Sequence, residues 1–321
     1  MTHDGIESMD QLHAHLDRGW DLVQRGDFHG ALRSAEEGLA LDETSPEANN
    51  LMGYVQAATG SADEALQYYE QAIASDETFV EAMLNAAEVE LRSLRNPEAA
   101  LRHIDEALDY LEEPDEIADA LLLRVDALLA KGDEAAARRT AARIPEGPFE
   151  NPELPFLIGR ARLDVGDLPG AAPLLEAAVR QDMTNPEVHY YLGLLLEAQG
   201  QEREATAAFL RTRELDLRRE LPYWHVPTEV FERHVQAAMT NLPAHVRDRL
   251  EGALVVVSNV PGPEVVSDGV DPRIPVLITT LQEDMARVGQ VFIYQLNVER
   301  AAATVEKMEA EILEAIVREL G

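Results

Sequence analysis

Apolar positions along the first two thirds of the chain recur three and four residues apart, the spacing of side chains that share one face of an α-helix. Residues 186–216 show this most clearly, with one such pattern on each side of Gly200. Leu192 and Leu196 mark the face of the first helix, and Phe209 lies on that of the second. One pair of helices cannot bury such faces alone. The pattern therefore predicts further copies of the pair, stacked against it.

The chain repeats itself at an interval of 34 residues. Small residues carry the repeat, because they leave room where helices cross. The pairs at this interval are Gly19 and Gly53, Gly26 and Gly60, Ala31 and Ala65, Gly159 and Gly193, Gly166 and Gly200, and Ala171 and Ala205. A helix–turn–helix unit with this period resembles the tetratricopeptide repeat. The resemblance implies a mainly α-helical superhelix, and we count six units over residues 10–220, after an N-terminal extension of residues 1–9.

The middle units depart from the strict period. One residue is inserted near Arg95, since the alanines that follow it come 35 residues after their counterparts rather than 34. Residues 144–148 read Ile-Pro-Glu-Gly-Pro, and Pro152 follows shortly after. Proline removes a backbone donor and clashes with the preceding turn of a helix, so this segment predicts a break between helices and a joint in the array.

In the tetratricopeptide family, the first helix of each pair lines a concave groove that binds peptide segments. The resemblance therefore implies a protein or peptide ligand. By register, the groove positions in this chain are Asn50, Tyr54, Leu84, Glu88, Phe156, Arg160, Tyr190 and Leu194. The three aromatic residues among them have two interpretations, as stacking anchors for a ligand or as core between neighbouring repeats.

The composition changes after residue 220. Residues 221–227 are rich in proline and aromatic residues and predict a hinge, and Thr228 is suited to cap the helix that follows. A second helix is expected after Pro243. Short apolar, β-branched runs predict strands at residues 253–258, 276–279 and 291–294. A last helix is expected from about residue 298, with one apolar face formed by Ala301, Val305, Met308, Ile312, Ile316 and Leu320. Residues 228–321 are thus expected to form a small α+β domain.

This C-terminal part resembles the small bacterial zincin-like metallopeptidases. The resemblance lies in the order of a helix, a Leu-Pro helix start, the run Ala-Leu-Val-Val-Val-Ser and a closing strand and helix. Zincins hold Zn²⁺ with two histidines one helical turn apart, and an intervening glutamate activates water. In that register Arg318 stands at the first histidine and Glu319 at the glutamate, and the chain ends before the second histidine. A guanidinium cannot ligate a cation. We therefore expect a degenerate domain without metal, cofactor or catalysis.

The remaining histidines offer no replacement site. His225, His234 and His245 are nine and eleven residues apart, which matches no pair of ligands on one helical turn. Without cysteine, thiolate zinc sites and disulfides are excluded. Serine lacks the sequence context of a nucleophile elbow. Glu319 alone keeps open the alternative of a metal-dependent peptidase with atypical ligands or ligands from another chain.

Charge narrows the range of partners. The net charge is −33, from 60 acidic and 27 basic residues, and it repels nucleic acid and anionic lipid. No apolar run approaches the roughly 20 residues needed to cross a bilayer, and the N-terminus does not resemble a secretory signal. A cytoplasmic protein is expected. The preferred hypothesis is a non-enzymatic interaction scaffold with an acidic groove. A co-chaperone or secretion chaperone for a basic client is a further alternative, which the sequence does not separate from the first.

Overall fold

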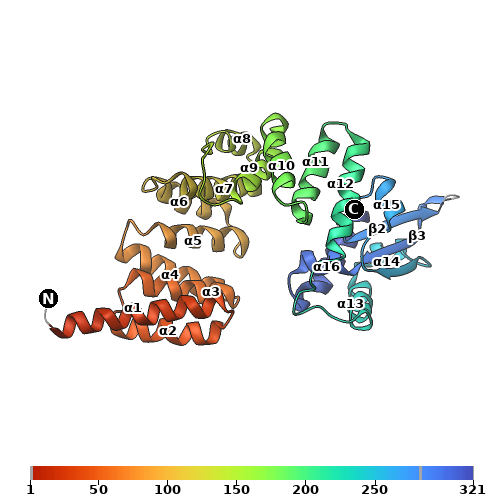
Figure 1. Cartoon of the computed structure of the whole chain (residues 1–321). Coiled ribbons are helices and arrows are strands. Elements are labelled where there is room, and N and C mark those ends of the chain that lie inside the picture. Colours follow the sequence, from red (N-terminus) through yellow and green to blue (C-terminus); the bar gives the residue numbers. More distant parts are fainter. Residues whose placement is uncertain (1–2, 282–283, 321) are drawn as a thin grey trace. The chain divides into compact units, whose positions relative to one another are not determined.

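The computed structural model describes residues 3–281 and 284–320 (Figure 1). The chain divides into two compact units, residues 1–174 and residues 175–321. Among the described residues, the chain starts with twelve consecutive helices. Their bounds are α1 (His3–Gln24), α2 (Phe28–Leu41), α3 (Pro46–Ala58), α4 (Ala62–Ser75), α5 (Val80–Arg92), α6 (Pro97–Leu108), α7 (Pro114–Lys131), α8 (Glu134–Ala141), α9 (Leu154–Asp164), α10 (Leu168–Gln181), α11 (Pro186–Ala198) and α12 (Glu202–Asp216). Helix α1 packs on α2, α3 on α4, α5 on α6, α7 on α8 and α11 on α12.

The turns within the pairs explain the period of 34. The first helix of a pair runs into a glycine with positive φ, +73° at Gly26 and +91° at Gly60, which L-residues rarely adopt. An aspartate then caps the second helix: Asp27 accepts the backbone N–H of Gly30 at 2.8 Å. A Cβ at Gly53 would lie 2.6 Å from the ring of Tyr69, so glycine is needed where α3 crosses α4. The repeated small residues therefore mark a turn and a crossing in pairs such as α3/α4, whereas Arg95, at φ +56°, takes the turn position between α5 and α6.

The predicted break in the middle of the array is confirmed. Helix α8 ends at Ala141 and α9 begins at Leu154, with no helix between them in the described chain. Ile144 is buried in this segment and fixes it to the core of α7 and α9. Asp115 accepts the backbone N–H groups of Glu150 and Asn151, at 3.2 and 2.8 Å. These contacts attach the segment to α7.

The second unit joins the last helix pair to the predicted α+β elements. These are α13 (Thr228–Asn241), α14 (Ala244–Arg249), β1 (Leu254–Ser258), α15 (Pro263–Ser267), β2 (Val276–Leu281), β3 (Asp284–Tyr294), α16 (Gln295–Ala302), a 3₁₀ turn (Val305–Lys307) and α17 (Met308–Leu320). The sheet has the order β1-β3-β2, with β1 parallel and β2 antiparallel to β3. All three predicted strands are present, and two of them are longer than predicted. The mainly helical fold class with a small C-terminal sheet is confirmed.

The core of this α+β part lies between the sheet and two helices. Phe231 of α13 and Met308, Ile312 and Ile316 of α17 are fully buried against Ile293 and its neighbours in the strands. The spacing of the α17 residues is the predicted apolar face. Amphipathic periodicity thus predicts correctly which side of the last helix meets the sheet.

The prediction of one continuous helix from about residue 298 is wrong. The chain forms α16, leaves the helix at Ala303 and starts α17 at Met308. Ala303 has φ +60°, and its N–H donates to the carbonyl of Glu299, which closes α16. Ala302 is buried and the predicted Ala301 is exposed. The break separates two helices that bury different faces. The three- and four-residue spacing of the apolar residues continues from Ala301 to Met308, so the spacing alone does not indicate the break.

The last helix pair shares a core with the C-terminal part. Tyr190 and Leu194 of α11 pack with buried Phe209 of α12 and Val266 of α15. Figure 1 shows α15 beside α12. The compact unit therefore begins before α11, although the composition changes only after residue 220. Residues 3–9, expected to be an extension, lie in α1. The boundaries predicted at residues 9, 220 and 227 stay predictions.

Candidate functional site

The first helices of successive repeats in the first unit line two adjoining cavities. One, of about 220 Å³, lies between α3 and α5. The other, of about 390 Å³, lies between α5, α7 and α9. Asn85, Glu88 and Arg92 line both, so the two form one groove along the inner helices. We call this the α3–α9 groove. Its size lies within the range of ordinary ligand pockets.

Four residues predicted from the repeat register lie in this groove. Tyr54 and Glu88 line the first cavity, and Leu84, Glu88 and Arg160 line the second. Tyr54 is 37% exposed, and its ring makes an edge contact with Trp20 at a centroid distance of 5.3 Å. Glu88 pairs with Arg92 at 2.8 Å. The register thus places aromatic, aliphatic and charged side chains on one surface.

The other predicted residues of the first unit lie at the edge of the groove or beneath it. Asn50 is buried; its amide donates to Glu81 at 2.9 Å and its oxygen accepts from Asn85 at 2.9 Å, so it ties α3 to α5. Phe156 is half-buried, and its neighbour Leu157 lines the second cavity in its place. Asn50 therefore positions a groove residue, Asn85, rather than facing the groove itself.

Tyr190 and Leu194 belong to the second unit and face its α+β part. The Tyr190 hydroxyl donates to Asp271 at 2.8 Å, and the Arg273 guanidinium lies 4.5 Å from the ring centroid. Burial and the neighbouring Asp271 raise the pKa of the Tyr190 phenol. Leu194 packs with Phe209 and Val266. Tyr190 therefore packs on the α+β part and on α12 of its own pair, a position that neither of the two interpretations described.

Helix α7 contributes groove residues that the register did not predict. Asp119, Leu122, Leu123 and Asp126 line the second cavity. Their spacing of three and four places them on one helical face, and this signal could have identified them. The inserted residue near Arg95 and the 18-residue length of α7 take this repeat out of the 34-residue register.

The groove contains carboxylates whose burial is only partly offset by nearby arginines. Burial raises the pKa of Asp126, although Arg160 and Arg92 act in the opposite direction. Burial likewise raises the pKa of Asp119, which lines the second cavity, and the neighbouring Asp115 adds to the effect. Each shift means that the charged form is less favourable in the groove than in water. A cation brought in by a ligand would relieve this.

A buried ion network joins the last repeat to the α+β part. Asp216, at the end of α12, accepts hydrogen bonds from Arg273 at 3.0 and 3.2 Å and pairs with Arg300 of α16 at 2.8 Å. Arg273 also donates to Glu187 of α11 at 2.8 Å. Burial would lower the pKa of Arg273, but the bonds to Glu187 and Asp216 outweigh it and raise the pKa. Burial and the nearby Arg273 lower the pKa of Arg300.

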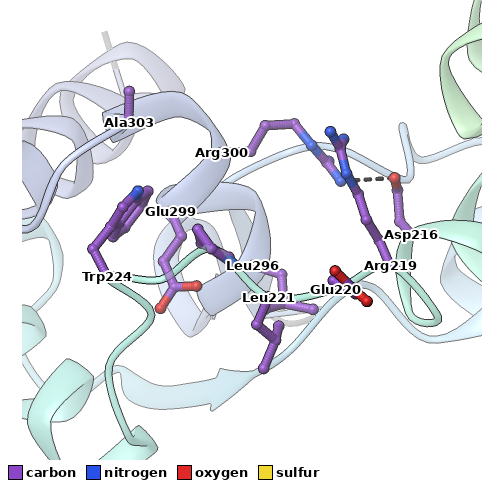
Figure 2. A pocket seen from close by; sticks show the side chains of 10 residues that line it. Asp216, Arg219, Glu220, Leu221, Trp224, Leu296, Glu299, Arg300 and Ala303 are labelled. Atoms are coloured by element: carbon purple, nitrogen blue, oxygen red, sulfur yellow. Dashed lines mark ion pairs between the residues drawn. The ribbon is translucent and has the colours of Figure 1, made fainter. Parts of the chain in front are cut away.

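A separate cavity of about 380 Å³ lies next to this network (Figure 2). It is formed by the end of α12, the segment that follows it and one face of α16. The lining residues are Asp216, Arg219, Glu220, Leu221, Pro222, Trp224, Leu296, Glu299, Arg300 and Ala303. Glu299 is buried and bonded to His225 at 2.8 Å and to Gln295 at 2.9 Å. We call this cavity the α12–α16 pocket.

The positions singled out by the zincin-like resemblance lie at the end of α17. Arg318 and Glu319 are both exposed there. His234, one of the histidines tested above as a metal ligand, forms a hydrogen bond with Glu309 at 3.0 Å. Over residues 3–281 and 284–320, no three histidines or carboxylates are grouped as metal ligands would be. In the same residues, no helix has both the length and the apolarity to cross a membrane.

Comparison with known proteins supports the repeat. The family model described as tetratricopeptide repeat matches residues 16–78, 81–151 and 156–216, together more than half of the chain. The fold is similar to that of Pseudomonas aeruginosa PilF, with 16% identity, 65% of this chain and 93% of that chain covered, and a TM-score of 0.56. PilW, a widely conserved type IV pilus biogenesis factor, gives 16% identity, coverage of 63% and 92%, and a TM-score of 0.55. A tetratricopeptide repeat protein from Parabacteroides merdae gives 14% identity, coverage of 96% and 99%, and a TM-score of 0.51.

Proposed function

Because the chain belongs to the tetratricopeptide repeat family, whose members generally mediate protein–protein interactions, we propose that it is a non-enzymatic scaffold that binds a basic peptide segment in the α3–α9 groove. The observation that carries this proposal is the position of Asp126. Its side chain is half-buried in the groove, and its pKa is raised by that burial. A lysine or arginine of a ligand would add to the positive charge of Arg160 and Arg92, which offsets the burial of Asp126 only in part.

The rest of the lining supports a peptide rather than a simple ion. Leu84, Leu122, Leu123 and Leu157 lie beside the carboxylates in the same cavity. Peptide recognition commonly combines apolar anchors with a few charged contacts. A segment with basic residues and apolar residues at short intervals fits this lining. The overall charge of −33 would also steer a basic partner toward the protein.

A selection experiment with a matched control tests the proposal. Random 12-residue peptides displayed on phage are selected on the full chain, and the strongest binder is measured by fluorescence anisotropy. We expect enrichment of lysine and arginine together with apolar residues. Asp126→Asn should weaken binding about tenfold, the loss of one partly buried charged contact of roughly 1.4 kcal/mol.

Glu64→Gln is the control, because it removes the same charge from an exposed position on α4. It should leave the affinity unchanged, while added salt should weaken binding by the unmodified chain. Selected peptides without basic residues, or equal losses in the two variants, would contradict a charge-selective groove. A client protein of a chaperone would be captured through the same contacts, so identifying the partner decides between scaffold and co-chaperone.

We extend the proposal to the C-terminal part as a degenerate zincin-like domain that holds no metal. Glu319 corresponds to the general base of that family, and Arg318 replaces the first histidine. Elemental analysis of the purified chain should find no stoichiometric zinc. One zinc per chain would instead support the peptidase hypothesis. A cytoplasmic location is also part of the proposal, and cell fractionation checks it.

A further inference from the structure

We propose that the α12–α16 pocket binds a small organic carboxylate with an apolar body and an N–H group beside the carboxylate, the chemistry of an apolar amino acid or of a peptide's C-terminal residue. The inference concerns the second unit and is independent of the α3–α9 groove. It rests on the distribution of charge and apolar surface around one cavity of about 380 Å³.

One end of the pocket presents two guanidinium groups. Arg300 is fixed there by Asp216 at 2.8 Å and by the oxygen of Asn297 at 3.3 Å. A guanidinium has five N–H donors, so these two bonds leave donors for a ligand. The side chain of Arg219 is 62% exposed and lies 4.0 Å from the carboxylate of Glu187. Figure 2 shows both guanidinium groups near Asp216. One fixed and one movable arginine suit a carboxylate, which accepts paired N–H groups.

The other end of the pocket is apolar. Trp224 and Leu296 are half-buried, and Leu221 and Pro222 are exposed at the rim. Leu221 is 53% exposed, a high value for leucine beside a cavity. The indole of Trp224 offers a flat face with a polar N–H, a surface that commonly packs against ligands. An apolar side chain of the ligand would cover these residues.

Two carboxylates restrict the charge of the ligand. Glu220 and the buried Glu299 also line the pocket. A dianion such as a phosphate monoester would be repelled by both, whereas a monocarboxylate is accepted by the arginines with less repulsion. Glu299 already accepts from Gln295 and is paired with His225, whereas the exposed Glu220 is available to accept a hydrogen bond from an amide or ammonium N–H. The N–H group that an amino acid carries next to its carboxylate fits this need.

The chain itself provides a reporter for the test. It contains two tryptophans, Trp20 and Trp224, so Trp20→Phe leaves the pocket residue as the single fluorophore. The probes are N-acetyl-L-phenylalanine, its carboxamide, free L-phenylalanine and the peptide Gly-Gly-Ala-Phe with a free C-terminus. We expect a saturable change in fluorescence with the carboxylates and at least a tenfold weaker response with the carboxamide.

Adjacent arginines give the matched control. Arg219→Ala should weaken binding at least fivefold, because it removes the movable half of the carboxylate contact. Arg218→Ala removes an equally exposed arginine that pairs with Glu214 outside the pocket, and should change binding less than twofold.

The two sources of the ligand are separated by comparing free phenylalanine with the peptide. Tighter binding by either one supports the proposal and identifies the source. No saturable change at millimolar concentrations, equal binding of carboxylate and carboxamide, or equal effects of the two arginine variants would overturn it. None of these results bears on the groove of the first unit.

Discussion

The carboxylate of Asp216, at the end of the last repeat helix, receives two hydrogen bonds from the guanidinium of Arg273 in the α+β part, at 3.0 and 3.2 Å. Only 2% of the Asp216 side chain and 9% of the Arg273 side chain are exposed. This pair, with Arg300 on the same carboxylate, is the polar centre of the second unit. The apolar contact of Phe209 with Val266 lies in the same unit. The ion network and this apolar contact together explain why the last helix pair and the α+β part form one compact unit.

Loss of the Asp216 charge should destabilise the second unit strongly. Asp216→Asn leaves two guanidinium groups without their shared anion, and breaking a buried pair in this way costs about 3 kcal/mol or more. Urea denaturation followed by circular dichroism measures the change. Glu214→Gln, two residues earlier in α12 and with a side chain that is 45% exposed, should leave the midpoint unchanged. If the two variants behave alike, the Asp216 network does not stabilise the fold. Replacing Arg273 with methionine in the Asp216→Asn background should recover part of the loss.

The two contacts of Tyr190 can be separated by two substitutions. Tyr190→Phe removes the hydrogen bond to Asp271 and keeps the ring under Arg273, and should cost about 1.5 kcal/mol, the usual value for a bond to a charged group. Tyr190→Leu also removes the cation–π contact and should cost about 1 kcal/mol more. Equilibrium unfolding in urea gives both values. A phenylalanine variant as stable as the unmodified chain would show that the hydroxyl contributes nothing.

The break between α16 and α17 predicts opposite effects for two exposed alanines. Ala303 has φ +60°, which costs an L-residue about 1 kcal/mol, so Ala303→Gly should stabilise the second unit by up to that amount. Ala301 lies inside α16, where glycine should cost about 1 kcal/mol. Thermal denaturation of both variants measures the difference. Equal effects at the two positions would contradict a left-handed residue at 303.

The groove carboxylates predict an unusual dependence of stability on pH. The pKa of Asp126 is raised above its ordinary 3.8 in the folded state. As the pH falls, the folded form therefore takes up this proton before the unfolded form does, and the group adds stability on acidification. At pH 7 that contribution is absent. Asp126→Asn should accordingly be more stable than the unmodified chain at pH 7, while binding basic peptides less well.

The advantage of the asparagine variant should shrink as the pH falls toward the ordinary aspartate pKa. Urea midpoints at pH 7 and pH 4 measure it. A variant that is less stable at pH 7 would mean that attraction to Arg160 and Arg92 exceeds the effect of burial. Opposite effects on stability and binding would mark Asp126 as a residue kept for binding rather than for folding.

The repeat architecture could be predicted because it is encoded locally. Gly26 and Gly60 end a helix because they adopt a positive φ, which depends on the local sequence. Gly53 must be small because the ring of Tyr69, only sixteen residues further along the chain, packs against it. The strands are likewise signalled by short β-branched runs such as that of β1. Within the groove, Tyr54, Leu84, Glu88 and Arg160 follow from the register. The α7 residues do not, because an insertion shifts that helix.

The sequence by itself determined the helix–turn–helix repeats, the three strands and the buried face of α17, since each depends on the spacing of residues along the chain. The tertiary structure alone decided that Arg273 meets Asp216, 57 residues away, and that Tyr190 faces Asp271, 81 residues away. It also decided that Trp224, Arg219 and Arg300 surround one pocket. No periodic pattern links these residues, which lie on different elements outside the repeat register or on its last helices. Their pairing depends on how the elements pack, which is fixed only when the whole unit folds.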